Sequence, residues 1–139
     1  MSTRSNIVVV TEDGRAHQFY HHWDGYLSGV GNEVRQCVVY SIGLHSLVKD
    51  MQFSDILVGE LTDYSEGYED EYVVDLDAHN RLHADIEFLY IVKDGKLYYV
   101  NEWDMCHKCN SYKDLVDYVC VDKNMIDLTH PCHDPDDED

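Results

Sequence analysis

The segment FYHHWDGYLSGVG, residues 19–31, gathers side chains that could perform acid–base chemistry. It contains two adjacent histidines, His21 and His22, followed by the carboxylate of Asp24. Because imidazole changes its charge near neutral pH, these three residues are the candidates for a catalytic acid or base. The glycines that follow predict a loop before a helix, and a helix start offers free backbone N–H groups to an anion.

A purely structural interpretation of the same segment stays open. In it, Trp23 and Tyr26 close the end of the hydrophobic core, and the glycines let the backbone pass close to the rings. The segment lacks the Lys-Ser/Thr ending of a phosphate-binding loop. Arg4 stands at the head of the first predicted strand and is expected to pair with Asp24. A ligand site here would use His22, Trp23, Asp24, Gly25, Tyr26, Gly29, Gly31 and Arg4.

The start MSTRSNI and the later stretch HWDGYLSGVG together resemble the pattern of a family of small uncharacterised phage and bacterial proteins. That pattern is M-x-T-R-S-x-I followed by H-W-D-G-Y-P-x-G-x-G, and Leu27 stands here in the position of its proline. The strand pair DIEFLYIVKDGKLYYV adds a looser likeness. The resemblance implies a common fold and a phage or mobile-element origin, and it implies no activity. If the motif is the family's site, it implies roles for residues 22–26, with Thr3, Arg4 and Ser5 nearby.

Cysteine and histidine cluster twice, in Cys106-His107-Lys108-Cys109 and in His130-Pro131-Cys132-His133. Two thiolates separated by two residues can reach one tetrahedral zinc ion at ~2.3 Å, and the second cluster could supply the remaining ligands. The candidate zinc ligands are Cys106, Cys109, His130, Cys132 and His133. The alternative is accidental clustering in a chain with five reduced cysteines, because one Cys-x-x-Cys is a weak signal.

Net charge is the unusual bulk property, since the chain contains 28 acidic and 10 basic residues and its formal charge is −18. Nucleic acids and anionic membranes require Lys and Arg, so we expect no direct binding to either. A carboxylate-rich surface could instead imitate nucleic acid and bind a basic host protein, such as a nucleic-acid-binding or defence protein. The expected partner-binding residues are Asp63, Glu66, Glu69, Asp70, Glu71, Asp75 and Asp77.

The pattern of strands and helices indicates an α+β fold with a mostly antiparallel sheet. The predicted strands are residues 6–10 and 16–22 in one hairpin, 85–92 and 97–100 in a second, and 72–77 alone. The period of two along residues 16–22 places His21 and His22 on opposite faces.

Helical spacing of apolar residues predicts one long helix over about residues 33–49, packed on the sheet. Ser111 is expected to cap a short C-terminal helix. Residues 54–61 fit either a short helix or a turn. We expect a single domain over residues 1–133, followed by a disordered acidic tail over residues 134–139.

Neither a membrane span of about 18 apolar residues nor a signal-peptide core is present in the sequence, which predicts a cytoplasmic protein. For a phage-encoded protein this means the host cytoplasm. The combined features favour a phage-type accessory protein that binds and modulates or inhibits a basic host protein, more than they favour an enzyme. Two alternatives stay open, a small-ligand protein or enzyme using the glycine-rich loop and a zinc-stabilised interaction module.

Overall fold

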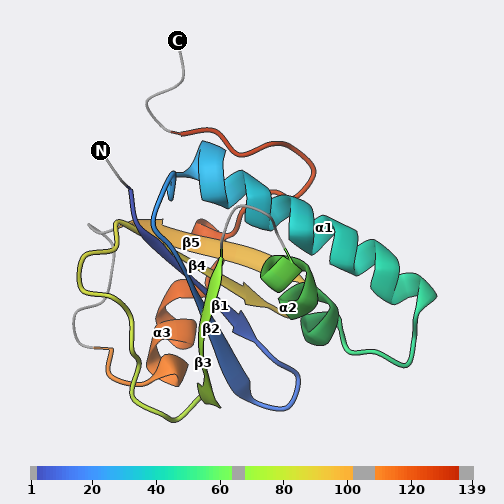
Figure 1. Ribbon diagram of the computed structural model, residues 1–139, viewed down its shortest axis with the longest axis horizontal. Helices are drawn as coiled ribbons and strands as arrows, with labels where there is room; N and C mark the ends of the chain where they lie inside the picture. Colours follow the sequence, from blue (N-terminus) through green and yellow to red (C-terminus); the bar gives the residue numbers. More distant parts are fainter. Residues whose placement is uncertain (1–2, 64–67, 102–108, 135–139) are drawn as a thin grey trace.

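The computed structural model describes residues 3–63, 68–101 and 109–134, without the side chain of Glu69. Five strands form one sheet in the order β3-β2-β1-β4-β5 (Figure 1). The strands are β1 (Ser5–Val10), β2 (Arg15–His21), β3 (Glu69–Asp75), β4 (Phe88–Lys93) and β5 (Lys96–Asn101). The helices are α1 (Asn32–Leu47), α2 (Phe53–Asp63) and α3 (Tyr112–Val119), with a π-helical turn at Leu27–Gly31 and a 3-10 turn at Asp122–Asn124.

The predicted α+β class and both predicted hairpins are confirmed. β1 pairs antiparallel with β2, and β4 pairs antiparallel with β5. The second hairpin turns at Asp94-Gly95, where both residues have positive φ, as a two-residue type I′ turn requires. The expectation of a sheet built from two hairpins needs correction, because the strand expected at residues 72–77 forms at Glu69–Asp75 and joins the sheet beside β2, and because β1 pairs parallel with β4.

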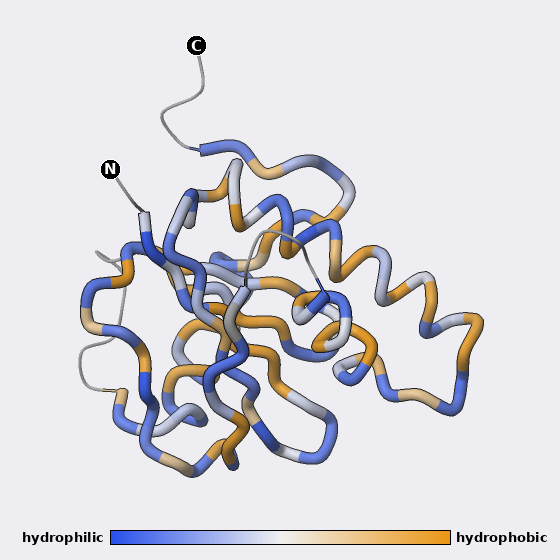
Figure 2. The backbone as a smooth tube through the Cα atoms, viewed as in Figure 1, coloured by the Kyte–Doolittle hydropathy of each residue, from blue (hydrophilic) through white to orange (hydrophobic). Residues whose placement is uncertain are grey.

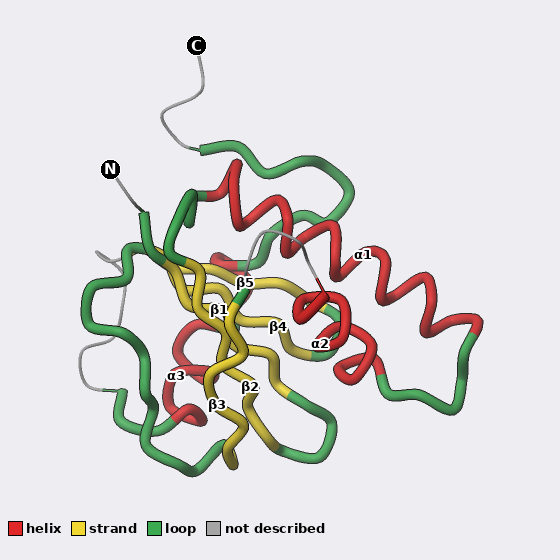
Figure 3. The backbone as a smooth tube through the Cα atoms, in the orientation of Figure 1, coloured by secondary structure: helices red, strands yellow, loops and turns green. Residues whose placement is uncertain are grey.

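Alternation along the central strands sends side chains to two separate cores. Ile7 and Val9 of β1 join the cluster beneath α1 and α2, whereas Val8 joins the cluster beneath α3. Hydrophobic residues run along the central strands (Figure 2), and helices cover both faces of the sheet (Figure 3). The sheet is therefore the middle layer of three.

The long helix and the C-terminal helix form where the sequence predicted them, with small shifts at the ends of the long helix. The long helix begins at Asn32 and ends at Leu47, and the ambiguous residues 54–61 lie inside α2. Ser111 caps α3 as expected, since its hydroxyl accepts the Asp114 N–H at 3.1 Å and the Asp114 carboxylate accepts the Ser111 N–H at 3.5 Å.

Removal of this cap should destabilise the protein without changing its fold. We expect Ser111→Ala to lower the free energy of unfolding by about 1 kcal/mol, because the first turn of α3 loses a partner for its N–H groups. Urea unfolding followed by circular dichroism would measure the change. The matched control is Ser46→Ala on the exposed side of α1, where alanine favours the helix and no loss is expected. Equal losses in both variants would contradict a specific role for the cap.

Candidate functional site

The two adjacent histidines face opposite sides of the sheet, as the alternation predicted. His21 lies on the α1 side, where its ring centroid is 4.6 Å from that of Tyr68 and its Nδ1 is 2.5 Å from the carbonyl oxygen of Trp23. His22 lies on the α3 side, with Nδ1 3.0 Å from the Tyr20 hydroxyl. The two imidazoles therefore do not converge on one site.

Asp24 takes part in the turn that follows β2. Its φ is 54°, and its carboxylate accepts a hydrogen bond from the Tyr26 hydroxyl at 2.9 Å. Its carbonyl oxygen accepts the Val30 N–H at 2.8 Å. A Cβ on Gly29 would lie only 2.2 Å from that carbonyl oxygen, so the turn requires glycine at this position.

Tyr90 of β4 fixes the same turn from the core side. Its hydroxyl is fully buried and donates a hydrogen bond to the carbonyl oxygen of Gly25 at 2.7 Å. A Cβ on Gly31 would lie 3.0 Å from this hydroxyl. Burial raises the pKa of Tyr90 well above its ordinary value, so the phenol stays a donor. These glycines therefore serve close packing, in agreement with the structural interpretation of the loop.

The backbone N–H groups that were expected to bind an anion are engaged within the chain. The π-helical turn at Leu27–Gly31 runs directly into α1, so the helix does not begin with a row of open donors. The N–H groups of Gly29 and Gly31 donate to the carbonyl oxygen of Tyr26 at 3.0 and 3.3 Å. Val30 donates to Asp24, as described above.

A further donor of the turn, Ser28, is bound by the C-terminal segment. The N–H and Oγ of Ser28 donate to the two carboxylate oxygens of Asp134 at 3.1 and 2.6 Å. A carboxylate of the chain itself thus occupies the place of an anionic ligand. Asp134 belongs to the segment 134–139 that was expected to be disordered, and the structure places it against the fold. Residues 135–139 lie outside the described residues.

Trp23 does not close the core, so that part of the structural interpretation is wrong. Its side chain is 59% exposed, and its ring meets His22 edge-on at 4.6 Å. Tyr26 is half-buried, and its hydroxyl is used by Asp24.

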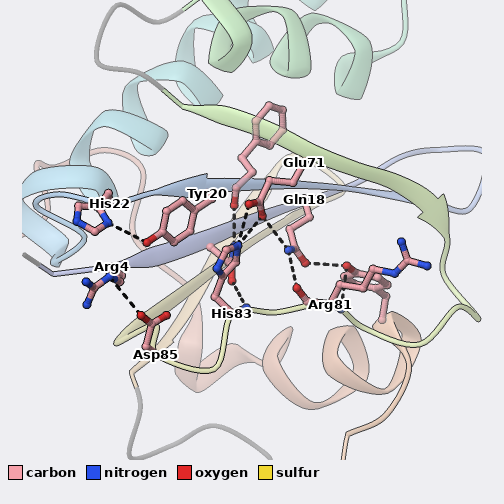
Figure 4. A network of polar contacts seen from close by, with 11 residues as sticks. Arg4, Gln18, Tyr20, His22, Glu71, Arg81, His83 and Asp85 are labelled. Atoms are coloured by element: carbon pink, nitrogen blue, oxygen red, sulfur yellow. Dashed lines mark hydrogen bonds and ion pairs between the residues drawn. The ribbon is translucent and has the colours of Figure 1, made fainter.

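A polar network on the α3 side of β2 and β3 was not predicted (Figure 4). Tyr72 pairs with Gln18 and Asp70 pairs with Phe19, so Glu71 is the extra residue of a β-bulge. The bulge turns Glu71 inward, where its carboxylate accepts the Gln18 amide at 3.1 Å.

Glu71 also lies 2.8 Å from Nε2 of His83, and the His83 ring stacks on Tyr20 with centroids 4.2 Å apart. Gln18 extends the network toward α3. Its carbonyl accepts the Tyr112 hydroxyl at 2.7 Å, and its amide also donates to the carbonyl oxygen of residue 81 at 2.9 Å. The network therefore ties β2, β3 and α3 to the loop before β4. The sequence signal that could have indicated it is Gln18 in the middle of a predicted strand, because an amide that becomes buried there needs hydrogen-bond partners.

Arg4 pairs with Asp85 and not with Asp24, so the predicted ion pair is wrong. The Arg4 Nε lies 3.3 Å from a carboxylate oxygen of Asp85, as Figure 4 shows. Arg4 stands at the start of β1, and the parallel pairing with β4 brings the loop before β4 to its side. That pairing could not be predicted from the hairpin pattern alone.

Glu71 and His83 resemble a catalytic acid–base pair, because a carboxylate lies within hydrogen-bond distance of one imidazole nitrogen. Tyr20 covers one face of that ring. A cavity of about 580 Å³ lies elsewhere, between β5, the C-terminal end of α3 and the segment after α3, and none of its lining residues belongs to the network. The network is thus placed to hold elements together, and it lines no described cavity.

The candidate partner-binding acids occupy three kinds of position. Asp63, Asp70 and Asp77 are exposed, whereas Asp75 is exposed with a carboxylate oxygen 3.6 Å from Arg15 Nε. Glu71 points inward. The side chain of Glu69 and all of Glu66 lie outside the described residues.

The candidate zinc ligands divide between the two faces of the sheet. His130, Cys132 and His133 line one shallow cavity of about 200 Å³ on the α1 side. Cys109 packs on the α3 side, and Cys106 lies outside the described residues. The structure does not bring Cys109 and the second cluster together, and no group of three metal-ligating side chains occurs among the described residues.

No family model matches the chain, and no curated protein or solved structure matches it. Among the described residues, no helix has both the length and the apolar character needed to cross a membrane.

The network gives the first prediction for this region. We expect Glu71→Ala to lower the free energy of unfolding by about 1–3 kcal/mol, because Gln18 and His83 lose a part-buried carboxylate partner. The neighbouring Asp70→Ala removes an exposed carboxylate and should change stability by less than about 0.5 kcal/mol. Urea unfolding of both variants at neutral pH measures the difference. Similar losses would show that the bulge does not give Glu71 a special role.

Buried thiols give a prediction for alkaline pH. Burial raises the pKa of Cys37 to about 11 and that of Cys120 to about 12, from an ordinary value of 9.0. A group with a raised pKa in the folded state stabilises the fold below its unfolded pKa, and this stabilisation is lost as pH rises toward the folded pKa. The free energy of unfolding should therefore fall between pH 9 and 12. The double variant Cys37→Ala/Cys120→Ala should show a smaller fall in urea titrations, and an unchanged fall would refute this assignment.

Proposed function

We propose that the protein binds a basic, extended segment of a partner protein along β3, at the acidic edge of the sheet. Within the described residues β3 pairs with β2 and with no strand on its other side. An edge strand presents unpaired N–H and C=O groups, to which another strand can be added. The open and acidic edge at β3 is the observation that carries the proposal.

The opposite edge of the sheet is partly covered by the chain itself. Tyr98 of β5 forms a bridge with Met125, and the Ile126 N–H donates to the carbonyl oxygen of Leu97 at 2.8 Å. This contrast favours β3 as the edge that receives a partner strand (Figure 1).

The side chains around β3 define the charge of the partner. Asp70, Asp75 and Asp77 are exposed along or just after the strand, and Arg15 is the cation that pairs with one of them. Lysine or arginine side chains of an added strand would meet these carboxylates. Each exposed ion pair contributes about 0.2–1 kcal/mol, so several pairs supply useful affinity and also orient the partner.

The chain's formal charge of −18 favours a partner that normally binds nucleic acid, because such proteins carry basic surfaces. The resemblance of the N-terminal third to phage proteins supports a host protein in this role, which includes proteins of host defence. Binding there would block or modulate the partner's nucleic-acid site. A ligand site in residues 21–31 has less support, since the N–H groups of residues 28–31 donate to acceptors of the chain itself.

A direct test uses a fluorescent peptide of alternating arginine and valine, with a glutamate–valine peptide as control. We expect the arginine peptide to bind the full chain and the glutamate peptide not to bind. Affinity should fall steeply between about 50 and 500 mM NaCl, because screening weakens the exposed ion pairs. Fluorescence anisotropy gives the dissociation constants, and slower hydrogen exchange at the β3 amides would report strand addition.

Matched variants separate a site at β3 from general attraction to an acidic protein. Asp70→Asn/Asp75→Asn/Asp77→Asn should weaken binding roughly tenfold, because three exposed pairs are lost. The control Asp94→Asn/Asp117→Asn/Asp122→Asn removes three exposed charges away from β3 and should change affinity less than about twofold. Equal weakening by both triple variants would contradict the proposal.

A further inference from the structure

We propose that the partner segment at β3 is a strand with the pattern basic–x–apolar–x–basic, paired with the backbone of Val73 and Asp75. In this pattern, x is a residue without positive charge. The apolar residue contacts Val73, and the two basic residues contact the carboxylates of Asp70 and Asp75. The inference rests on the binding proposed above and deepens it, because it specifies the partner's side chains and its register on β3.

The backbone of β3 presents hydrogen-bonding groups to its open side at alternate residues, as in any antiparallel ladder. The carbonyl oxygen of Gly14, just before β2, accepts the Leu76 N–H at 3.2 Å. Leu76 therefore directs its backbone groups toward β2, and by alternation Val74 does the same. Val73 and Asp75 direct their N–H and C=O groups to the open side.

The pairing on the other side of β2 agrees with this assignment. The Thr11 N–H donates to the carbonyl oxygen of Arg15 at 2.9 Å, so Arg15 directs its backbone toward β1. The next residue, Ala16, directs its backbone toward β3 and pairs there with Val74. Both observations place the backbone groups of Val73 on the open side.

One of the outward groups is already used within the chain. The carbonyl oxygen of Asp75 accepts the Ala78 N–H at 3.0 Å in the turn that follows β3. In the part of the chain that the structure describes, no hydrogen bond engages the N–H or C=O of Val73 or the N–H of Asp75. These three groups are the ones that an added strand can bind after the bulge.

The bulge at Glu71 limits regular pairing to this part of β3. Asp70 pairs with Phe19, whose side chain lies in the cluster beneath α1 and α2. By the same alternation Asp70 directs its backbone outward, but three positions separate it from Val73, whereas outward groups of a regular strand recur at every second position. A regular partner strand in register with Val73 is therefore out of register at Asp70. Only its long basic side chain extends to that carboxylate.

The side chains of Asp70, Val73 and Asp75 share the α1 side of the sheet. Val73 pairs with His17, and His17 pairs with Val9, which lies in the cluster beneath α1 and α2. Val73 is 44% exposed, and the carboxylates on both sides of it are exposed as well. Because neighbouring side chains on one face of a sheet contact each other, this row favours basic, apolar and basic residues at alternate positions of the partner.

Cations of the chain itself determine where further positive charge is unfavourable. The Arg81 guanidinium lies 5.0 Å from the centre of the Tyr72 ring, and Arg81 belongs to the α3 side with Glu71 (Figure 4). A basic partner residue on that face would meet a like charge, so x carries none. On the α1 side Arg15 pairs with Asp75 at 3.6 Å but leaves the Asp75 side chain 71% exposed, so a second cation can share this carboxylate.

Two peptides of one composition test the pattern against general attraction between charges. They are TTRTVTRTT, which has valine and both arginines on one face of a strand, and TTTRVRTTT, which has them on opposite faces. Since their charges are equal, salt screens the binding of both alike. In about 50 mM NaCl we expect fluorescence anisotropy with the full chain to give TTRTVTRTT a dissociation constant at least about fivefold lower, because only this peptide matches all three β3 side chains.

The Val73→Thr variant tests the apolar contact and keeps a β-branched residue in the strand. It should bring the dissociation constants of the two peptides within about twofold of each other. The matched control Val121→Thr changes a valine that is 37% exposed beside β5, at the opposite edge of the sheet, and it should keep the fivefold difference. Equal behaviour of the two variants, or equal binding of both peptides to the unchanged chain, would overturn the inference.

Amide hydrogen exchange measured by NMR locates the pairing on β3. At saturating TTRTVTRTT we expect the N–H groups of Val73 and Asp75 to exchange at least about tenfold more slowly, and that of Asp70 to change less than about twofold. Unchanged exchange at Val73 and Asp75 would overturn the inference. The binding proposed at β3 still holds in that case if the arginine–valine peptide binds and the triple aspartate variant weakens it. Failure of every basic peptide to bind would contradict both proposals.

Discussion

The parallel pairing of β1 with β4 is the constraint on which the rest of the structure depends. Each strand belongs to its own antiparallel hairpin, and this one pairing makes the hairpins a single sheet. β1 is then an inner strand, and its consecutive apolar side chains need cover on both faces of the sheet. Helices α1 and α2 cover Ile7 and Val9, and α3 covers Val8. The same pairing brings Asp85 to Arg4 and Tyr90 to Gly25.

Features set by local chemistry could be predicted from the sequence, whereas features set by distant pairing could not. The turn at Asp94-Gly95, the cap at Ser111 and the opposite faces of His21 and His22 depend on neighbouring residues. The partner of Arg4 depends on which strands meet, and strand alternation does not encode that choice.

The inward direction of Glu71 follows from a bulge, because one extra residue redirects the side chains that follow it. The sequence pattern alone therefore assigned Glu71 to an acidic surface along with its neighbours. The turn at Asp24–Gly31 shows the same limit. Its residue types permit a ligand site, but three-dimensional packing decides which donors stay open. The Ser28 N–H, for example, donates to Asp134, which is 106 positions away along the chain.

The open edge at β3 also bears on how the folded protein avoids self-assembly into fibrils. The open side of an edge strand is a template to which identical chains can add one after another. Flat and uncharged edges grow most readily in this way. Here the bulge at Glu71 bends the template, and the carboxylates of Asp70 and Asp75 would face their own copies across any such stack. The bulge and the carboxylates therefore both oppose the addition of identical chains at the β3 edge.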